Sequence, residues 1–497
     1  MKKINHFING KIYSDKKARL GKIFNPAIGE QIAEVELASK ATMEMAIENS
    51  AKAYLKWSKT TPITRARILS KYKDLLIKNM DDLAVMVSEQ HGKTIPDAKG
   101  SIQRGIEVVE YATGITDSLK GDYSSSVGTN VDSHTLRQPL GVCAGITPFN
   151  FPAMVPMWMY PVAIACGNTF ILKPSEKDPS CPMRLGELAI EAGMPAGVLN
   201  VVNGDKEAVD TLLESKNVQA ISFVGSTPIA EYVYHTGTKN NKRVQALGGA
   251  KNHMVVMPDA DVKKTTDAII GSAFGSAGER CMAISVAVCV GEKTARNLKT
   301  KLLEETAKLN VGPYTDEKSD FGPLNNKAHY EKVLGYIDIG EKEGAKLLSD
   351  GRDMKLQGYE NGYFVGPTIF ENVKPNMRIY KEEIFGPVLS MMTTETYEDA
   401  LKLVNDHELG NGAAVFTKSG NIAKHFTENA KIGMIGVNVP IPVPVAYHSF
   451  GGWKRSLFGD HSMHGPEGVR FYTRLKTATV TWVEDNAGPE FTIPVLS

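Results

Sequence analysis

The sequence predicts an α/β protein built around mostly parallel sheets. Short runs rich in β-branched residues alternate with helical segments from Leu140 to Val290, which is the pattern of βαβ units. A second alternating region extends from about Leu302 to Val439. The chain has 497 residues, which is too long for one core of ordinary size, so we expect two or three domains.

The first elements of the chain are short strands followed by helices. Strand candidates lie around FINGKIY and IFNPAIGEQIAEV. Apolar residues then recur at helical spacing over residues 41–57 and again over 63–91, and Gly92 is placed to end the second helix. The buried strands expected after these helices read VCAGI, TFILK, VLNVV, AISFV, NHMVV and ISVAVCV.

A polar segment interrupts this pattern between Asp122 and Arg137, where the sequence is DYSSSVGTNVDSHTLR. It has few core residues and little helical period, so we expect an extended hairpin that leaves the main body. The run FYTRLKTATVTW (471–482) alternates apolar and polar residues, as an exposed strand does. Exposed strand edges carry unpaired N–H and C=O groups that can pair with another chain, so we expect these segments to pair between subunits. The alternative is a local two-stranded flap.

Composition excludes several classes of protein. Lys and Arg number 57 and Asp and Glu number 56, a net charge of +1 that indicates neither a nucleic-acid nor a membrane partner. The five cysteines form no CxxC pair, so neither a disulfide framework nor a metal site is expected. The N-terminus lacks the apolar region of a signal peptide, and the longest apolar stretch, Ala153 to Cys166, is shorter than the roughly 20 residues of a membrane span. We expect a cytoplasmic protein.

Two strand ends could bind a dinucleotide, although no GxGxxG fingerprint follows a predicted strand. ISFV runs into Gly225, then Ser226 and Thr227 as helix caps, and the free N–H groups of that helix start suit a pyrophosphate. The alternative is a helix cap with no ligand. TFILK places Lys173 and Glu176 at its carboxyl end, where a carboxylate can bind ribose hydroxyls. The alternative is a pair of solvated loop charges.

Cys281 is the candidate nucleophile. It lies in the Gly-rich loop GSAGERCM (275–282), where small residues let a substrate approach the sulfur and Arg280 favours the thiolate. The other four cysteines are expected to be buried small apolar residues, which is also the alternative for Cys281. Asn150, fixed within PFNFP, can donate an amide N–H to an oxyanion; the alternative is an Asn turn.

These segments together resemble the aldehyde dehydrogenase superfamily. The matches, in the family's order, are PFNFP (148–152), LKPSE (172–176), FVGST (223–227), LGG (247–249), GERC (278–281) and EEIFGPV (382–388). The resemblance implies a Rossmann-type NAD-binding domain (1–121 and 140–248), an α/β catalytic domain (249–467) and a β-hairpin oligomerisation domain (122–139 and 468–497). It also implies a homo-oligomer, a dimer of dimers.

The resemblance assigns roles to particular residues. Cys281 would be the nucleophile, and Asn150 with the Cys281 main-chain N–H would form the oxyanion hole. The implied NAD-binding residues are Thr147, Phe149, Lys173, Glu176, Lys177, Gly225, Ser226, Gly248, Glu383 and Phe385.

One departure from the family pattern decides the expected acyl acceptor. Hydrolytic members carry a glutamate just before Leu-Gly-Gly, whereas Ala246 stands there in this chain. Water is a poor nucleophile without a positioned base, and a thiol needs less help because a few per cent is already thiolate at neutral pH. The missing base therefore predicts transfer of the acyl group from Cys281 to coenzyme A. The alternatives are a hydrolytic enzyme that uses another base, and a binding protein that kept the fold but lost the chemistry.

The chain closely resembles the CoA-acylating malonate- and methylmalonate-semialdehyde dehydrogenases of this superfamily. The matching segments are ITPFNFPAMVPMWMYPVAIACGNTFILKPSE, ALGGAKNH, GERCMA and GGWKRSLFGD. Their substrates carry a carboxylate, and Arg104 and Arg280 match the two arginines that bind it, as forked guanidinium bonds can. The alternatives are a helix-surface Arg104 and an Arg280 that only stabilises a thiolate. The implied products are acetyl-CoA or propionyl-CoA, carbon dioxide and NADH.

Overall fold

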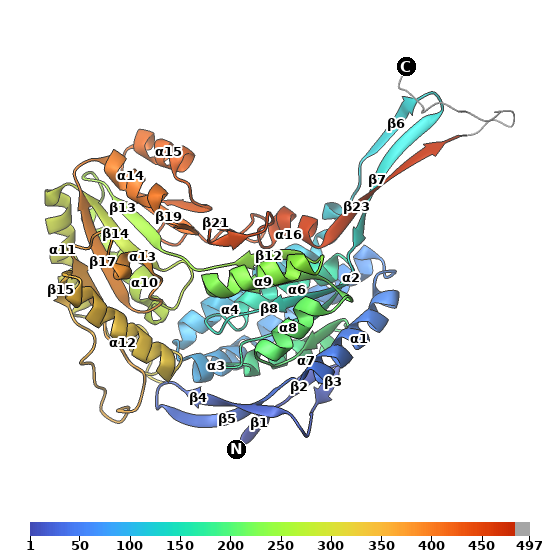
Figure 1. Cartoon of the computed structure of the whole chain (residues 1–497), viewed down its shortest axis with the longest axis horizontal. Coiled ribbons are helices and arrows are strands. Elements are labelled where there is room, and N and C mark those ends of the chain that lie inside the picture. The colour runs from blue at the N-terminus through green and yellow to red at the C-terminus, as the bar shows by residue number, and fades with distance from the viewer. Residues whose placement is uncertain (483–497) are drawn as a thin grey trace.

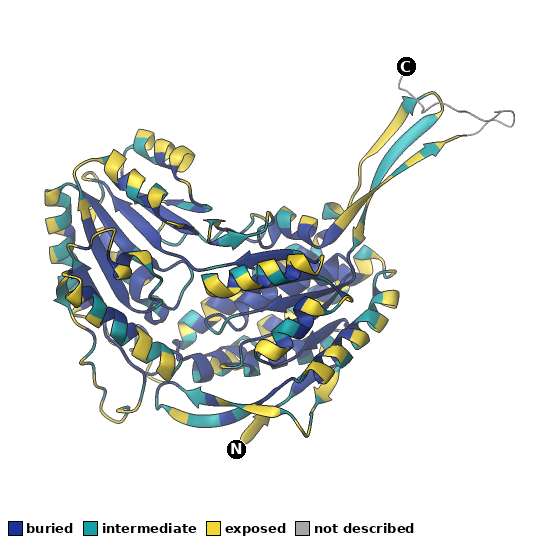
Figure 2. Ribbon diagram, in the orientation of Figure 1, coloured by how far each residue is buried: buried dark blue, intermediate teal, exposed yellow. Residues whose placement is uncertain are grey.

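The structure, a computed structural model, describes residues 1–482. It has two lobes, each built around its own sheet, and a narrow three-stranded sheet that projects from one of them (Figure 1). Buried residues follow the two central sheets, whereas the projecting sheet is exposed or half-buried (Figure 2). The predicted α/β class is confirmed.

The first lobe contains an eight-stranded sheet in the order β22-β12-β11-β8-β9-β10-β2-β3. Its strands are β2 (His6–Ile8), β3 (Lys11–Tyr13), β8 (Val142–Ile146), β9 (Thr169–Lys173), β10 (Leu199–Val201), β11 (Val218–Val224), β12 (Arg243–Leu247) and β22 (Leu457–Phe458). The five strands from β8 to β12 are parallel to their neighbours within that group. After β8 the chain adds β9 and β10 on one side and then β11 and β12 on the other. The strand order therefore reverses between β8 and β11, and ligands bind at such a point in open α/β sheets.

Helices cover both faces of this sheet. They are α1 (Lys40–Trp57), α2 (Pro62–Lys78), α3 (Met80–His91), α4 (Ile95–Thr113), α5 (Ile115–Ser118), α6 (Met154–Ala165), α7 (Ser180–Glu191), α8 (Lys206–Glu214), α9 (Thr227–Lys239) and α16 (Gly465–Phe471). The twelve residues of α6 are all buried, which explains why the longest apolar run of the sequence lies there. No helix within residues 1–482 is long and apolar enough to cross a membrane.

The prediction of one continuous helix over residues 63–91 is wrong. The chain leaves helical geometry at Asn79 (φ −99°, ψ 15°), whose side-chain amide donates to the Leu75 carbonyl at 2.8 Å and satisfies the end of α2. Apolar spacing continues across this break, so periodicity alone could not locate it. Gly92 ends α3 at φ +98°, as predicted.

The second lobe contains a seven-stranded sheet in the order β15-β16-β17-β14-β13-β19-β20. Its strands are β13 (Asn252–Val256), β14 (Ile284–Val290), β15 (Lys346–Ser349), β16 (Thr368–Glu371), β17 (Val388–Thr394), β19 (Gly412–Phe416) and β20 (Met434–Val437). Only the edge strand β15 runs antiparallel to its neighbour in this sheet. The surrounding helices are α10 (Val262–Phe274), η1 (Gly275–Gly278), α11 (Glu292–Thr306), α12 (Lys327–Lys342), α13 (Arg378–Lys381), α14 (Tyr397–Asp406) and α15 (Gly420–Asn429).

The projecting sheet joins the predicted hairpin to the predicted final strand. Its strands are β6 (Tyr123–Gly128), β7 (Val131–Pro139) and β23 (Thr473–Thr481), in the order β23-β7-β6. β23 pairs with β7 in antiparallel register from Thr473 opposite Pro139 to Thr481 opposite Val131. The outer edges of β6 and β23 are unpaired within residues 1–482, so pairing between subunits stays a prediction. Residues 483–497 of the expected oligomerisation domain lie outside the described residues, and the domain boundaries also remain predictions.

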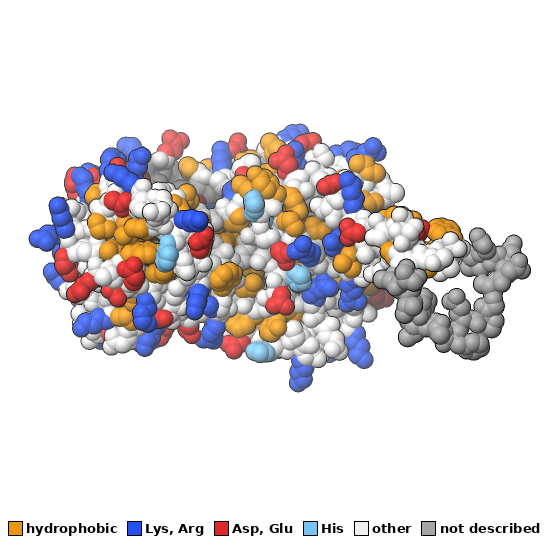
Figure 3. All heavy atoms as spheres, turned by 90° about the horizontal axis from the view of Figure 1, so that it is seen from above, with side chains coloured by type: hydrophobic (Ala, Val, Ile, Leu, Met, Phe, Trp, Pro, Cys, Tyr) orange, Lys and Arg blue, Asp and Glu red, His pale blue; other side chains and the backbone are white. Residues whose placement is uncertain are grey.

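A ribbon of N-terminal strands lies against the first lobe. It consists of β1 (Lys2–Ile4), β4 (Arg19–Asn25) and β5 (Glu30–Leu37), in the order β1-β5-β4. A further short pair, β18 (Leu409–Gly410) with β21 (Trp453–Lys454), lies near the boundary of the lobes. On the face shown in Figure 3, basic and acidic side chains are interspersed, with small apolar patches between them.

Candidate active site

The nucleophile loop connects η1 to β14 and has a constrained backbone. Ser276, Ala277 and Gly278 all have positive φ angles, of 56°, 52° and 73°. A Cβ atom on Gly278 would lie 2.2 Å from the Gly386 carbonyl oxygen, so only glycine fits where the loop meets the segment after Phe385. Cys281 is half-buried and the other four cysteines are buried. The structure therefore separates Cys281 from the others, as the sequence predicts.

Two amide side chains hold the main chain at the nucleophile. The Nδ2 atoms of Asn252 and Asn411 donate to the Cys281 carbonyl oxygen at 2.9 Å and 3.0 Å. Asn252 also donates to the Ala283 carbonyl and accepts from the Gly412 N–H, both at 2.9 Å. Our sequence analysis missed both asparagines. The available signal was a polar residue at the start of two wholly buried strands, β13 and β19.

The pKa of the Cys281 thiol is raised and not lowered. Burial, with a smaller contribution from the Glu383 carboxyl, raises its pKa to about 12, although the N–H groups of Cys281 and Met282 and the Arg280 guanidinium act in the opposite direction. Arg280 thus acts in the predicted direction, but burial outweighs it. The expectation of a low-pKa thiol is corrected here: partial exposure, and not acidity, distinguishes Cys281 from the other cysteines.

Asn150 lies in the loop after β8 and faces the nucleophile loop. Its side chain is buried, and its Nδ2 donates to the Glu279 carbonyl oxygen at 3.0 Å. An amide NH₂ has two donors, so the second N–H remains available to an oxyanion. The buried Lys93 ammonium donates to the Asn150 carbonyl at 2.7 Å and lies 4.1 Å from the Phe151 ring centroid. Lys93, which the sequence analysis did not single out, therefore fixes the segment that carries Asn150.

The two predicted substrate arginines are both associated with α4: Arg104 belongs to this helix, and Arg280 forms an ion pair with one of its residues. Arg280 Nη2 lies 2.8 Å from Asp97 Oδ1 in the first turn of α4. Arg104 donates to Glu107 at 2.6 Å and to the carbonyl oxygens of Val443 and Pro444 at 3.1 Å and 2.8 Å. Residues 97 and 104 are seven positions apart, which is two helical turns, or about 10 Å of rise on the same face.

The predicted ribose-binding residues meet at the carboxyl end of β9. Lys173 Nζ lies 3.6 Å from Glu176 Oε2, and Lys177 Nζ lies 3.7 Å from Glu176 Oε1. Both lysines lower the pKa of Glu176 against the opposing effect of burial, so it is a carboxylate at neutral pH. Across the switch point, Thr147 follows β8, and its buried Oγ1 has no hydrogen-bond partner among the described residues. A buried polar atom left in this way indicates a bound ligand or water.

The loops after β11 and β12 form the other wall of this cleft. Ser226 is the exposed N-cap of α9, directly after Gly225. Pro228 has no N–H and the Ile229 N–H donates to the Ser226 carbonyl at 3.1 Å, so the Thr227 N–H and the positive end of the helix are what this start offers an anion. Thr227 Oγ1 accepts from the Gly249 N–H at 2.9 Å, and a Cβ atom on Gly248 would lie 2.9 Å from the Arg455 carbonyl oxygen. Glycine is therefore required at position 248, where the chain passes close to Arg455 and Thr227. These features fit a dinucleotide.

Glu383 and Phe385 connect that wall to the nucleophile. Glu383 accepts the Ala250 N–H at 2.9 Å through one oxygen, and burial raises the pKa of its carboxyl. Phe385 has φ +64°, a conformation that bulky residues seldom adopt, and its carbonyl accepts from His329 Nε2 at 2.6 Å. The Phe149 ring lies edge-on to Phe385, with centroids 6.1 Å apart. Rings from the two lobes therefore meet beside the nucleophile loop.

The position of the family's glutamate is apolar in this chain. Ala246 lies in β12, fully buried, opposite Phe223 of β11 and Phe458 of β22. All three side chains belong to the same apolar cluster. No carboxylate at this position is available to activate water.

Comparisons with known proteins agree with these features. The model of the aldehyde dehydrogenase family matches residues 13–478. A malonate-semialdehyde dehydrogenase of Pseudomonas aeruginosa is 55% identical over 495 residues, covering 99% of each chain. A Sinorhizobium meliloti protein, assigned as a methylmalonate-semialdehyde dehydrogenase and crystallised with NAD, has a TM-score of 0.97 at 55% identity and covers 97% of this chain and 99% of that one. The methylmalonate-semialdehyde dehydrogenase of Oceanimonas doudoroffii has a TM-score of 0.96 at 53% identity, with the same coverage.

Proposed function

Because this chain belongs to the aldehyde dehydrogenase family, we propose that it oxidises malonate or methylmalonate semialdehyde with NAD and transfers the acyl group to coenzyme A. The names of its relatives support the substrate, and the NAD bound to the Sinorhizobium protein supports the cofactor. The observation that carries the acyl acceptor is the buried Ala246, which leaves the thioester without a base for water.

The substrate's carboxylate would be bound by Arg104 and Arg280. Three hydrogen bonds occupy Arg104 in the free protein, and a guanidinium has five donors, so N–H groups remain for a ligand. Arg280 is held by Asp97 on the same helix face, next to the nucleophile in sequence. Two guanidiniums held in this way select a carboxylated aldehyde over a neutral one.

Different residues would bind the successive parts of the NAD molecule. Glu176, with Lys173 and Lys177, would bind the adenosine ribose, and a carboxylate there disfavours a 2′-phosphate. Ser226 and the start of α9, with Gly225 and Gly248, would accept the pyrophosphate. Glu383 would bind the second ribose, and Thr147, Phe149 and Phe385 would line the ring site. When bound, NAD supplies the hydride acceptor.

The first chemical step belongs to Cys281. Its thiol releases its proton to solvent, the sulfur attacks the aldehyde carbon, and the carbonyl electrons move to oxygen. The oxyanion would be stabilised by the second Nδ2–H of Asn150 and by the Cys281 main-chain N–H, whose positions Lys93 and Asn252 fix. Loss of hydride from that carbon restores the carbonyl and leaves an acyl thioester on Cys281.

Decarboxylation and transfer complete the reaction. The substrate carboxylate is β to the thioester carbonyl, so loss of carbon dioxide leaves an enolate that the same donors stabilise until a proton is added. The coenzyme A thiolate then attacks the thioester carbon, and Cys281 leaves as a thiolate. The order, with decarboxylation first, rests on the family resemblance.

We further propose that the active form is an oligomer assembled through the projecting sheet, as a dimer of dimers. The unpaired edges of β6 and β23 support this, since long exposed edges favour pairing with another chain. In this proposal residues 122–139 and 468–497 form the oligomerisation domain, 1–121 with 140–248 the NAD-binding domain, and 249–467 the catalytic domain.

Product analysis tests the proposed reaction. Each semialdehyde is incubated with NAD, with and without coenzyme A, and NADH, carbon dioxide, free acid and acyl-CoA are quantified. We expect acyl-CoA equal to NADH when coenzyme A is present, and one turnover of NADH per site when it is absent. Cys281→Ala is the control and should form no NADH. Sustained formation of free acid in the presence of coenzyme A would contradict the proposal.

A further inference from the structure

A pocket of about 410 Å³ lies beside the predicted ribose site. We name it the lysine pocket; its walls are β4 with the turn that follows it, the loop after β9, the start of α12 and Tyr363. Lys22 and Phe24 contribute one wall, Lys177 a second, and Asn325, Lys327 and Tyr363 the rest. Lys177 also lies 3.7 Å from Glu176, so the pocket adjoins the dinucleotide cleft and is not a separate part of the surface.

All the charged side chains that line the lysine pocket are positive. Three lysines line it, and no carboxylate does so among the described residues. Lys327 approaches Glu331 only at 4.0 Å, and both side chains are exposed. Lys22 is opposite Glu34 across the ribbon, but no ion pair within 4.0 Å joins them in residues 1–482. Such lysines bind phosphate as point charges, so the pocket suits an anion with more than one phosphate.

Two further features favour a nucleotide over a simple anion. Phe24 is half-buried and brings an aromatic ring that can stack on a base, whereas the other aromatic residue of the lining, Tyr363, is buried in the core of the second lobe. Lys327 and Ala328 begin α12, a helix of 16 residues whose N-cap Asn326 accepts from the His329 N–H at 3.0 Å. The N–H groups of the first helical turn add positive potential at the same wall.

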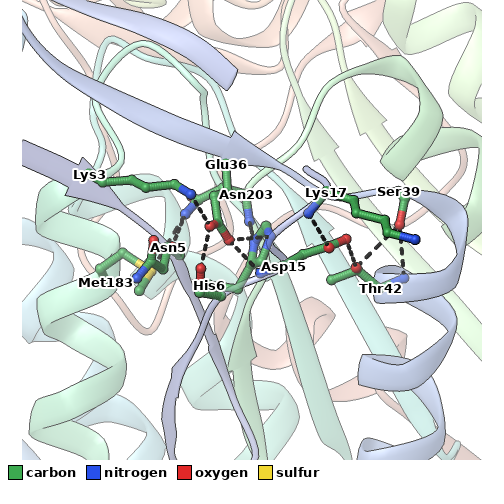
Figure 4. Close-up of polar contacts among 11 residues, drawn as sticks. Lys3, Asn5, His6, Asp15, Lys17, Glu36, Ser39, Thr42, Met183 and Asn203 are labelled. Atoms are coloured by element: carbon green, nitrogen blue, oxygen red, sulfur yellow. Dashed lines mark hydrogen bonds and ion pairs between the residues drawn. The ribbon is translucent and has the colours of Figure 1, made fainter. Parts of the chain in front are cut away.

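The wall that carries Lys22 and Phe24 is firmly attached to the body. Glu36, the last residue but one of β5, is buried and accepts from Lys3 Nζ at 2.7 Å, from Ser14 Oγ at 2.6 Å and from the Asp15 N–H at 2.9 Å (Figure 4). The same network continues through Asn203, whose Nδ2 donates to the Asn5 carbonyl at 2.6 Å. The pocket is therefore preformed, which reduces the ordering cost of binding.

The opposite wall leads to the nucleophile loop. The Asn325 N–H donates to Glu279 Oε1 at 3.1 Å, and Glu279 is two residues before Cys281. Asn325 also donates to the Gln90 carbonyl at 3.0 Å, three residues before Lys93. A ligand held in the lysine pocket thus rests against the framework that positions the thioester.

We propose that the lysine pocket binds the 3′-phosphorylated adenosine end of coenzyme A, with Lys22 and Lys327 as phosphate ligands. This inference rests on the proposed acyl transfer to coenzyme A. It assigns to the acceptor a site beside the NAD cleft, sharing only Lys177 with the residues assigned to NAD. The pantetheine arm would enter the cleft past Glu176 towards Cys281.

Acyl-transfer kinetics with coenzyme A and with 3′-dephospho-coenzyme A test the assignment. The variants are Lys22→Gln, Lys327→Gln and the double variant; Lys342→Gln, at the other end of α12, is the matched control. We expect the double variant to raise KM for coenzyme A at least about tenfold, as loss of charged phosphate contacts does. KM for dephospho-coenzyme A, KM for NAD and kcat should stay within about twofold, because the other contacts are unchanged.

The outcomes separate this inference from the proposed function. Acyl-CoA formation with an unchanged KM for coenzyme A in the double variant would overturn the pocket assignment alone. An equal rise in KM for both forms of coenzyme A would also overturn it, since the 3′-phosphate would then lie elsewhere. A wild-type enzyme that forms free acid and no acyl-CoA would contradict the proposed function instead.

Discussion

Asn252 holds the main-chain carbonyl of Cys281 through a 2.9 Å hydrogen bond from its side-chain amide. The bond joins the first residue of β13 to the loop before β14, so the nucleophile is positioned by the sheet of the second lobe. Asn411, directly before β19, the strand that pairs with β13 on the side away from β14, donates to the same oxygen. Hydrogen bonds from residues of two adjacent parallel strands therefore fix the main chain of Cys281, and with it the position of the sulfur.

We expect Asn252→Ala to slow acylation about 10- to 100-fold, because a small displacement of a nucleophile has effects of this size. Asn411→Ala should have a smaller effect, since one of the two bonds to the Cys281 carbonyl remains. Single-turnover formation of NADH measures the step directly. An Asn252→Ala enzyme with a wild-type acylation rate would show that the hydrogen bond does not position the sulfur.

The Cys281 pKa of about 12 predicts how alkylation of the cofactor-free enzyme depends on pH. Far below its pKa a thiol gains about tenfold in thiolate per pH unit, so the rate with iodoacetamide should rise from pH 7 to 9.5 without a plateau. Mass spectrometry of the labelled peptides should find Cys281 first, since the other cysteines are buried.

Glu383→Gln tests whether the Glu383 carboxyl contributes to the raised pKa of the Cys281 thiol. The Glu383 carboxyl raises the thiol pKa, so its replacement by an amide should increase the labelling rate at any fixed pH in this range. A plateau below pH 8 in the wild type, or slower labelling in the variant, would contradict this account of the thiol.

The sequence predicts the parts of the molecule in which local pattern and burial coincide. β8, β9 and β13 are buried along their whole length, and each contains a short apolar run in the sequence: VCAGI, FIL and MVV. The Gly-rich loop identifies Cys281 for a related reason, since Gly278 cannot be replaced where it meets Gly386. In both cases the structural requirement, burial of a strand or a glycine at a close contact, determines the residue types at that position and can be recognised in the sequence.

The remaining features depend on contacts between distant residues. Asn411 contacts the Cys281 carbonyl across 130 positions, and Arg280 is held by Asp97 across 183 positions. The pKa of the thiol depends on how deeply the loop is buried, which the adjacent Arg280 does not reveal. The sequence alone therefore identifies the reacting residues more easily than it identifies the residues that hold them in position.

Replacement of Arg104 should separate carboxylated from neutral aldehydes. Arg104→Leu is expected to raise KM for malonate semialdehyde about tenfold or more, because charge-assisted bonds are lost, and to change KM for propanal less than about twofold. Arg184→Leu is a matched control, since Arg184 also bonds a glutamate three residues on, Glu187, but lies on α7. Equal effects of Arg104→Leu on both substrates would refute the carboxylate role.

Lys251 links pH to stability in the segment that carries Glu383. Its buried ammonium donates to the Ile379 and Glu382 carbonyls at 2.7 Å and 2.9 Å, and burial lowers its pKa to about 7. The unfolded lysine titrates near pH 10.4. Between these values the unfolded chain binds more protons than the folded protein, so this residue makes the free energy of unfolding rise with pH, by up to about 1.4 kcal/mol per unit.

Lys251→Met removes this contribution, so the difference in stability between the wild type and the variant should shift towards the wild type from pH 7 to 9 and stay constant below pH 6. Thermal unfolding of both proteins across pH 5.5–9 measures the difference and cancels the titrations that the two share. The same variant should raise KM for NAD more than it lowers kcat, because the Ile379 and Glu382 carbonyls fix the chain next to Glu383. A stability difference that is flat across the whole pH range would show that Lys251 does not titrate near neutrality.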